Sequence, residues 1–264
     1  MTQTTTDQAI SNKKVINSNI ATLSFQEAVD HIFYLAEHKS SSFVCFANVH
    51  MIVEAFKDHY FQEVINQADL ALPDGLPLTK YIGIFENTHQ DRVAGPDTMP
   101  EIMKRAAMEN KSVYFYGGSD FMLHMMVERA REELPQLNIA GAYAPPYRPL
   151  TREEDKQIVE KINNVNPDFV FVCLGCPKQE NWMHRHKDKI KSCMLGVGQA
   201  FTIYAGLEER APEWAQKNCL EWAYRLYREP KRLARRYIYT NAVFLYLVSR
   251  LYFRKLRKKE LLPI

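Results

Sequence analysis

The stretch DLALPDG, residues 69–75, joins a short apolar run to one isolated acid. The apolar letters at 70–72 predict a buried strand, which Pro73 ends because proline lacks a backbone donor, and Gly75 permits a sharp exit. Ligands of open α/β sheets bind beyond the carboxyl ends of the strands, so we expect Asp74 to face a binding site. Two roles stay open for its carboxyl group: it either caps the helix that follows or acts as a general base toward an acceptor hydroxyl.

Outward from this stretch, short apolar runs alternate with segments of helical periodicity. Capping boxes, formed by Ser24 with Glu27 and by Thr151 with Glu154, mark the starts of two helices. Strands that alternate with helices of about 10 to 15 residues are typical of a doubly wound, mostly parallel sheet, so we predict a Rossmann-like α/β fold. Besides the strand at 70–72, the predicted strands fall within residues 43–47, 112–120, 138–143, 168–174 and 193–197.

The composition is that of an ordinary soluble globular protein: of 264 residues, 46% are hydrophobic and 25% are charged. The polar N-terminal segment has no apolar run of the kind found in signal peptides, and we expect residues 1–19 to form a disordered tail. Five cysteines, an odd number, fit a reducing cytoplasm. Cys173 and Cys176 form a C-x-x-C without a second pair, so no metal site is predicted.

Charge is divided unevenly along the chain. Residues 215–264 hold 13 Lys and Arg against 3 Asp and Glu, whereas the rest of the chain holds 21 against 28. We therefore expect an α/β domain over residues 20–214 and a basic helical appendage over residues 215–264. The apolar segment 237–248 reaches only about 18 Å as a helix, too short for a hydrocarbon core of roughly 30 Å. It favours an amphipathic helix on an anionic membrane surface; nucleic-acid binding is disfavoured, because no recognisable module accompanies the charge.

Groups suited to binding follow several predicted strands. Asn48 and His50 stand after the strand at 43–47. Gly117 and Gly118 lie between a strand and a helix, where backbone amides can approach a diphosphate or ribose, although a tight turn alone also explains the pair. After the strand at 168–174, the side chains of KQE offer a cation, an amide and a carboxylate to a sugar or a uracil, or form an exposed first helical turn; they are Lys178, Gln179 and Glu180.

Four arginines of the appendage follow spacings of three, four and three residues, which would place them along one helical face. Pro230 lies inside this segment and must kink or restart the helix. No D-x-D motif occurs in the sequence to hold a divalent metal, so we expect arginines to neutralise a departing diphosphate. The four are Arg225, Arg228, Arg232 and Arg235.

Eight motifs, taken together and in order, resemble those of the WecG/TagA/CpsF glycosyltransferases over about residues 20–240. One feature differs: some members have a threonine two residues before the asparagine of the first motif, where this chain has Phe46, a change consistent with a different donor sugar. The motifs are FANVHM (46–51), ALPDG (71–75), RVAGPD (92–97), YFYGG (114–118), LGCPKQE (174–180) with Trp182, GVGQAF (196–201), RAPEW (210–214) and LEWAYRLYREPKRLARRY (220–237).

The resemblance implies an inverting, metal-independent transfer of a sugar from a UDP-sugar, with no cofactor, to a polyprenyl-diphosphate-linked saccharide. Such an enzyme would be peripheral on the inner, cytoplasmic face of the cell membrane and would build cell-surface polysaccharide or teichoic-acid-type glycans. The base of the family falls on Asp74, and the other catalytic groups on Asn48, Arg225, Arg232 and Arg235. Together with the groups at the strand ends, the expected substrate-binding residues are His50, Gly75, Arg92, Asp97, Gly117, Gly118, Gly175, Lys178, Gln179, Glu180 and Gly198.

Two other classes of protein remain as alternatives. A Rossmann-type oxidoreductase would bind NAD through Gly117 and Gly118, and would need an acidic ribose ligand about 20 residues further on, after a second strand. Glu132 and Glu133 have that separation but fall within a predicted helix. A non-enzymatic peripheral membrane or RNA adaptor would use the basic appendage alone. The surfaces rich in Tyr and Phe leave both self-association as a homo-oligomer and lipid contact open.

Overall fold

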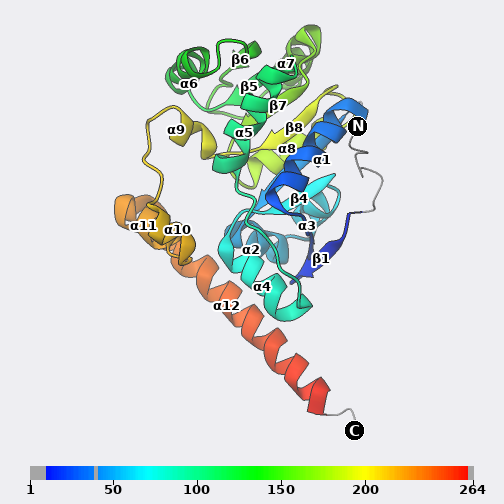
Figure 1. Cartoon of the computed structure of the whole chain (residues 1–264), viewed down its shortest axis with the longest axis vertical. Helices are drawn as coiled ribbons and strands as arrows, with labels where there is room; N and C mark the ends of the chain where they lie inside the picture. Colours follow the sequence, from blue (N-terminus) through cyan, green and yellow to red (C-terminus); the bar gives the residue numbers. More distant parts are fainter. Residues whose placement is uncertain (1–9, 39–40, 261–264) are drawn as a thin grey trace.

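The computed structural model describes residues 10–38 and 41–260, and its centre is a six-stranded sheet in the order β4-β3-β8-β7-β5-β6 (Figure 1). Every neighbouring pair of strands in this sheet is parallel, which confirms the predicted α/β class with a doubly wound sheet. The strands are β3 (Ser42–Ala47), β4 (Leu70–Pro73), β5 (Ser112–Gly117), β6 (Asn138–Tyr143), β7 (Phe169–Cys173) and β8 (Cys193–Gly196).

Helices cover both faces of the sheet, so each strand carries apolar side chains on both sides. In β7, Phe169 and Phe171 belong to one apolar core and Val170 and Val172 to the other, as the two-residue period of a strand requires. One core is packed by α1 (Phe25–His38), α5 (Gly95–Met108), α6 (Asp120–Glu133) and α9 (Ala200–Tyr204). The other is packed by α2 (Val49–Lys57), α3 (His59–Asn66), α4 (Leu76–Glu86), α7 (Arg152–Val165) and α8 (Lys178–His186).

The N-terminal segment corrects one prediction. A hairpin of β1 (Asn12–Val15) and β2 (Ser18–Ala21) packs beside the edge strand β4, and Val15 and Ile20 are fully buried there. The expected disorder of residues 1–19 is therefore wrong for residues 12–19, whereas residues 1–9 lie outside the described residues. The sequence did not reveal this hairpin because its strands are short and polar, and their few apolar side chains find partners only in the tertiary structure.

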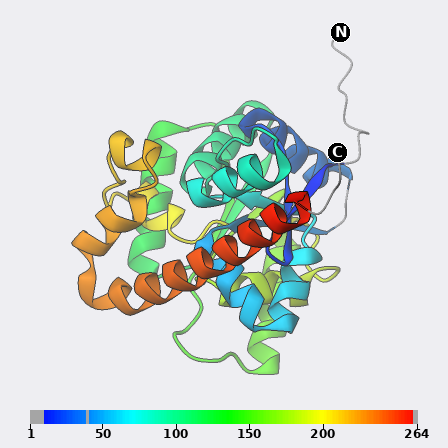
Figure 2. The ribbon, with the colours of Figure 1, turned by 90° about the horizontal axis from the view of Figure 1, so that it is seen from below.

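Three helices form the C-terminal appendage: α10 (Glu213–Lys217), α11 (Glu221–Arg228) and α12 (Pro230–Glu260). Pro230 begins a new helix, as predicted. In Figures 1 and 2, α12 crosses the body alongside α2 and continues past it. The boundary between residues 214 and 215 stays a prediction, since α10 begins two residues earlier.

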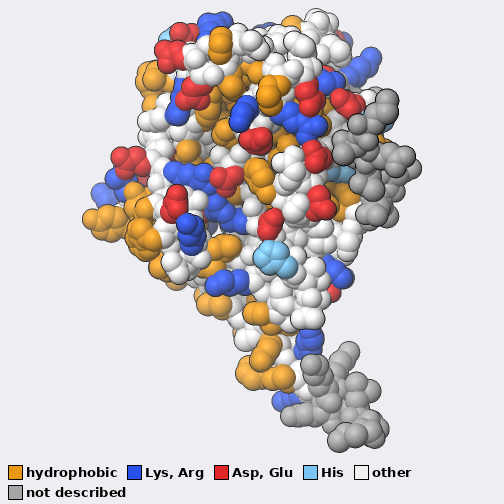
Figure 3. All heavy atoms as spheres, in the orientation of Figure 1, with side chains coloured by type: hydrophobic (Ala, Val, Ile, Leu, Met, Phe, Trp, Pro, Cys, Tyr) orange, Lys and Arg blue, Asp and Glu red, His pale blue; other side chains and the backbone are white. Residues whose placement is uncertain are grey.

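Helix α12 has two different sides. Leu233, Tyr237, Phe244 and Leu247 are buried on the side that packs against the body. Other apolar side chains of the same helix are exposed, and Figure 3 shows hydrophobic groups interspersed with basic ones along its projecting part. None of the helices in the described part of the chain is long and apolar enough to cross a membrane. The exposed apolar residues are Ile238, Tyr239, Leu245, Tyr246, Tyr252, Phe253 and Leu256.

Candidate active site

A cleft of about 880 Å³ lies between the carboxyl edge of the sheet and helices α11 and α12. Its floor is formed by the segments that follow β3, β4, β7 and β8, which are adjacent in the sheet. Its other wall belongs to the appendage, so residues more than 150 positions apart face one another. Of the predicted site residues, eleven line this cleft: Asn48, His50, Asp74, Gly75, Arg92, Gly175, Gln179, Glu180, Gly198, Arg225 and Arg232.

Asp74 stands at the mouth of the sheet, one residue beyond β4. Its backbone N–H donates to the carbonyl oxygen of Ala47 over 2.8 Å, which fixes it beside the end of β3. Helix α4 begins after Gly75 and has no side-chain cap, so the hypothesis that Asp74 caps this helix is wrong. Gly75 has a φ of −103°, which any residue adopts, so the exit from β4 does not use the conformational freedom of glycine.

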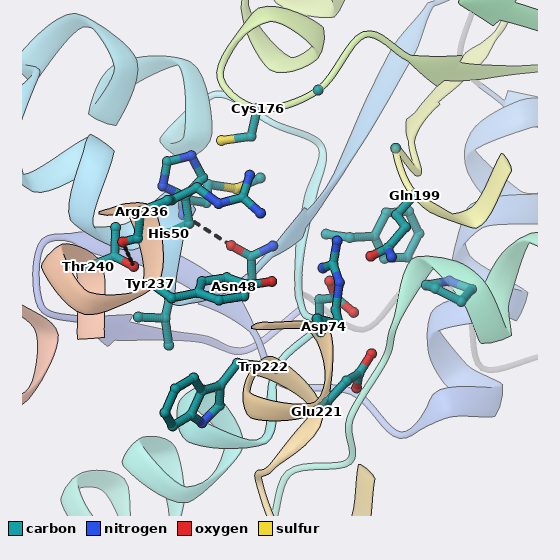
Figure 4. Close-up of a pocket in the computed structure, with 18 of the residues that line it drawn as sticks. Asn48, His50, Asp74, Cys176, Gln199, Glu221, Trp222, Arg236, Tyr237 and Thr240 are labelled. Atoms are coloured by element: carbon teal, nitrogen blue, oxygen red, sulfur yellow. Dashed lines mark hydrogen bonds between the residues drawn. The ribbon is translucent and has the colours of Figure 1, made fainter. Parts of the chain in front are cut away.

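The surroundings of Asp74 favour its neutral form. Burial and the nearby carboxylate of Glu221 raise the pKa of Asp74 from an ordinary value of 3.8 to about 7, against the opposing effect of Arg92 and Arg225. Figure 4 shows Asp74 and Glu221 on the same side of the cleft. A carboxylate that titrates near neutral pH is well matched to removing a proton from a hydroxyl group.

Arg92 joins the body to the appendage. Its guanidinium donates to Glu221 Oε2 at 2.7 Å, to Asp97 Oδ2 at 2.9 Å and to Gln216 Oε1 at 3.1 Å. Asp97 also pairs with Arg210 at 2.5 Å and does not line the cleft, so the structure does not bring it to the predicted site. Arg92 and Asp97 thus form an ion-pair network that holds α10 and α11 over the strand ends.

The appendage arginines do not share one face. The break at Glu229 and Pro230 ends the regular spacing, because α11 and α12 are separate helices. Arg225 lies 3.9 Å from Glu208, and Arg232 bonds Glu229. Arg235 is exposed and is not among the residues that line the cleft, whereas the next residue, Arg236, lines it. The structure therefore does not bring Arg235 to the predicted site.

Asn48 and His50 lie at the start of α2, directly after the carboxyl end of β3. Asn48 Oδ1 accepts the Met51 N–H at 3.1 Å and caps the helix. Burial and the charge of Arg236 lower the pKa of His50, although Glu54 lies 3.9 Å from its ring. The imidazole is therefore neutral near pH 7.

Gln179 is held by the protein on both ends of its amide. Its Oε1 accepts the Gly175 N–H at 3.2 Å, and its Nε2 donates to the Gly196 carbonyl and to Glu180, each at 2.8 Å. Glu180 is fully buried, and burial raises its pKa to about 7. Gly198 has a φ of +51°, and a Cβ there would lie 3.3 Å from Gln179 Oε1. These residues shape the floor, while Lys178 is exposed and does not line the cleft.

Gly117 and Gly118 do not reach the cleft, so their predicted substrate contact is corrected to a tight turn. Gly117 has a φ of +112°, and a Cβ there would lie 2.2 Å from the Cys173 carbonyl oxygen. The Gly118 N–H donates to that same oxygen at 3.0 Å. Glu133 lies on α6 and pairs with Arg129 at 2.6 Å. The arrangement that an NAD-binding oxidoreductase requires is therefore missing at this strand end.

Several residues of the cleft were not predicted. Gln199 belongs to the GVGQAF motif, and Glu221 and Trp222 belong to the LEWAYR segment. Both motifs were recognised in the sequence, but these three side chains were not predicted to line the site. Arg236 is the neighbour of Arg235, which was predicted to be a catalytic residue. Among the described residues, no three His, Cys, Asp or Glu side chains are grouped so that they would hold a metal ion. The other polar residues of the cleft that sequence reasoning missed include Thr202, Glu208, Gln216, Glu229, Tyr237, Thr240 and Asn241.

A parallel sheet whose carboxyl edge presents an acid of raised pKa beside several arginines is typical of enzymes that transfer a group. Residues 13–259 match the family described as the glycosyl transferase WecG/TagA/CpsF family. The chain belongs to this family, and it is a glycosyltransferase.

Curated relatives cover most of the chain. One from Bacillus subtilis is 31% identical over 234 residues, 86% of this chain and 86% of the relative, and one from Bacillus spizizenii is 31% identical over 203 residues, 76% and 77%. One from Staphylococcus aureus is 29% identical over 229 residues, 86% and 87%. Each is named N-acetylglucosaminyldiphosphoundecaprenol N-acetyl-beta-D-mannosaminyltransferase.

Proposed function

We propose that this protein transfers a sugar, with inversion, from a UDP-sugar to a polyprenyl-diphosphate-linked saccharide at the inner face of the cell membrane. The product would enter a cell-surface polysaccharide or teichoic-acid-type glycan. The names of the relatives support an N-acetylglucosamine-bearing lipid diphosphate as the acceptor and make N-acetylmannosamine the first donor sugar to test. The observation that carries the proposal is that Asp74 faces the cleft with a pKa near 7 and does not cap the following helix.

In the proposed reaction, the Asp74 carboxylate accepts the proton of an acceptor hydroxyl. The oxygen of that hydroxyl forms a bond to the anomeric carbon from the side opposite UDP, while the bond from that carbon to the diphosphate oxygen breaks. The electron pair of the broken bond leaves on UDP. One displacement inverts the anomeric centre, and no covalent sugar–enzyme intermediate is needed.

The departing diphosphate requires positive charge. Arg225 and Arg232 line the cleft and can form charge-assisted hydrogen bonds to phosphate oxygens. Each faces one acid of the protein, Glu208 and Glu229 respectively, which the diphosphate would replace as its partner. We propose that these arginines serve in place of a divalent metal and that the reaction needs no cofactor.

The appendage supports action at a membrane surface. The exposed apolar side chains of α12 alternate with Arg250, Arg254 and Lys255, a composition suited to an anionic lipid surface. Because the same helix forms one wall of the cleft, binding to lipid would bring the site to its lipid-linked acceptor.

A panel of UDP-sugars tests the proposal. Each is incubated with the full-length protein and a short-chain polyprenyl-diphosphate-linked N-acetylglucosamine, and UDP release is measured with and without a metal chelator. We expect acceptor-dependent release with one donor sugar, unaffected by the chelator, and a product of inverted anomeric configuration. Absence of release with every donor, or release that the chelator abolishes, would contradict the proposal.

A further inference from the structure

Arg236 differs from the other arginines of the cleft in forming no ion pair within the described part of the chain, although its charge acts on Glu229 from a greater distance. Arg92, Arg225 and Arg232 each contact a carboxylate of the protein. Among the described residues no side chain forms an ion pair with Arg236, and its Nε is buried without a hydrogen-bond acceptor. Its guanidinium lies 5.1 Å from the centre of the Tyr237 ring. A cation that is partly buried and unpaired inside a cleft is a candidate ligand of an anion.

Arg236 and Asp74 lie in different limbs of the cleft. Figure 4 shows Arg236 with His50 on one side of Asn48, and Asp74 on the other side. The electrostatic effects agree with this placement: the charge of Arg236 acts on His50, whereas Arg92 and Arg225 act on Asp74. Arg236 and Arg225 therefore act on different functional side chains of the cleft, although the charges of both, and that of Arg232, also act on Glu229.

The limb of Arg236 leads to an apolar wall. Beyond Thr240 and Asn241, the apolar side chains of Phe244 and Leu245 follow Arg236 along α12 and line the same cleft. Leu245 is largely exposed, so this wall continues onto the outer apolar side of the helix. Figure 4 shows the polar side chain of Gln199 on the side of Asp74. An anion bound at Arg236 would thus have an apolar path on one side and the acid on the other.

The proposed reaction brings two diphosphates into one cleft, that of the donor and that of the acceptor. We infer that Arg236, with His50 beside it, binds the diphosphate of the lipid-linked acceptor, and that the donor diphosphate is bound by Arg225 and Arg232. The first units of the polyprenyl chain would then lie along Phe244 and Leu245. This inference rests on the proposed function and assigns the two phosphate-bearing substrates to different arginines.

The test compares Arg236→Gln with Arg235→Gln, an exposed neighbour on the same helix, and with Arg225→Gln. Calorimetry measures binding of two probes, farnesyl diphosphate and UDP, to each full-length variant. Because hydrogen bonds to charged groups are strong, we expect Arg236→Gln to weaken farnesyl diphosphate binding about tenfold or more and to change UDP binding less than about twofold. Arg225→Gln should do the reverse, and Arg235→Gln should change neither.

Kinetics provide a second readout. Arg236→Gln should raise KM for farnesyl-diphosphate-linked N-acetylglucosamine and leave KM for the donor near that of the wild type, and Arg236→Lys should recover part of the loss. Retained UDP binding shows that the variant is folded. The inference is overturned if Arg236→Gln weakens UDP binding instead, or if Arg235→Gln has the same effect as Arg236→Gln. A wild type that binds both probes but transfers no sugar contradicts the proposed function and not the division of the two sites.

Discussion

Asp74→Asn removes the proposed base while keeping the shape of the side chain. Among the described residues no group donates a hydrogen bond to the Asp74 carboxyl, and its backbone N–H remains bonded to Ala47. The variant should therefore fold like the wild type. Removal of a general base lowers kcat by about 10²–10⁴. KM for the donor should change little, because the arginines that face the diphosphate are untouched.

The same substitution should not reduce stability. The pKa of Asp74 rises from 3.8 to about 7 on folding, so above pH 7 the folded state carries a carboxylate that the unfolded state accommodates better. A difference of about three between the two pKa values corresponds to roughly 4 kcal/mol, and water at this partly exposed position reduces that figure. We expect the Tm of Asp74→Asn at pH 8 to equal or exceed that of the wild type. Most of the gain should be lost near pH 4, because the acid is neutral in the folded state and only about half ionised in the unfolded state, whose pKa is 3.8.

Two assays check this reasoning on one protein sample. UDP release at saturating substrates, measured from pH 5.5 to 9, should rise in the wild type with an acid limb near pH 7 and stay uniformly low in the variant. Differential scanning fluorimetry at pH 4 and pH 8 supplies the stability comparison. Undiminished turnover would refute the assignment and move the base to His50. A Tm well below that of the wild type at pH 8 would show that Asp74 is a structural ion-pair partner.

Three further substitutions follow from the geometry. Glu221→Gln removes a negative charge beside Asp74, so the pKa of Asp74 should fall and the acid limb of the kcat/KM profile should move to lower pH. An acid limb that does not move would show that Glu221 only holds the appendage in place. Gly118→Ala should lower the free energy of unfolding, measured by chemical denaturation, by about 1–3 kcal/mol, because φ is +71° there, and KM for the donor should stay unchanged. A raised KM without a loss of stability would show that this turn contributes to the site. Replacing Tyr246 and Phe253, both exposed, with Ser should weaken sedimentation with anionic vesicles about tenfold or more while a soluble acceptor is still used; equal sedimentation would exclude this face of α12 from lipid contact.

Local sequence patterns were sufficient for the strands of the central sheet and for the position of Asp74, although not for the hairpin of β1 and β2. The run LALPDG predicted a strand followed by Asp74, and the structure has β4 end at Pro73 with Asp74 next to the cleft. The capping box of Thr151 with Glu154 is formed as expected. Such features depend on neighbours within a few residues, where proline, glycine and apolar spacing act directly on the backbone.

Strand order decided which strand ends share a site. Gly117 and Gly118 follow a strand as Asp74 does, but β8 and β7 stand between β5 and the strands β3 and β4. The turn is packed against Cys173 and does not open into the cleft. A glycine pair has the same local appearance in a tight turn and in a phosphate-binding loop, so only the tertiary structure distinguishes the two.

The amino-acid sequence by itself determined an α/β sheet with an acid after one strand and a basic, partly apolar C-terminal segment, because these follow from periodicity, breakers and charge along the chain. The tertiary structure decided that Arg236 rather than Arg235 enters the cleft, and that Arg92 binds Glu221 from 129 positions away. The rotation of α12 about its axis, which chooses between two adjacent arginines, is set by the packing of Tyr237, Phe244 and Leu247 against the body. That packing joins segments distant in sequence, and no local pattern specifies it.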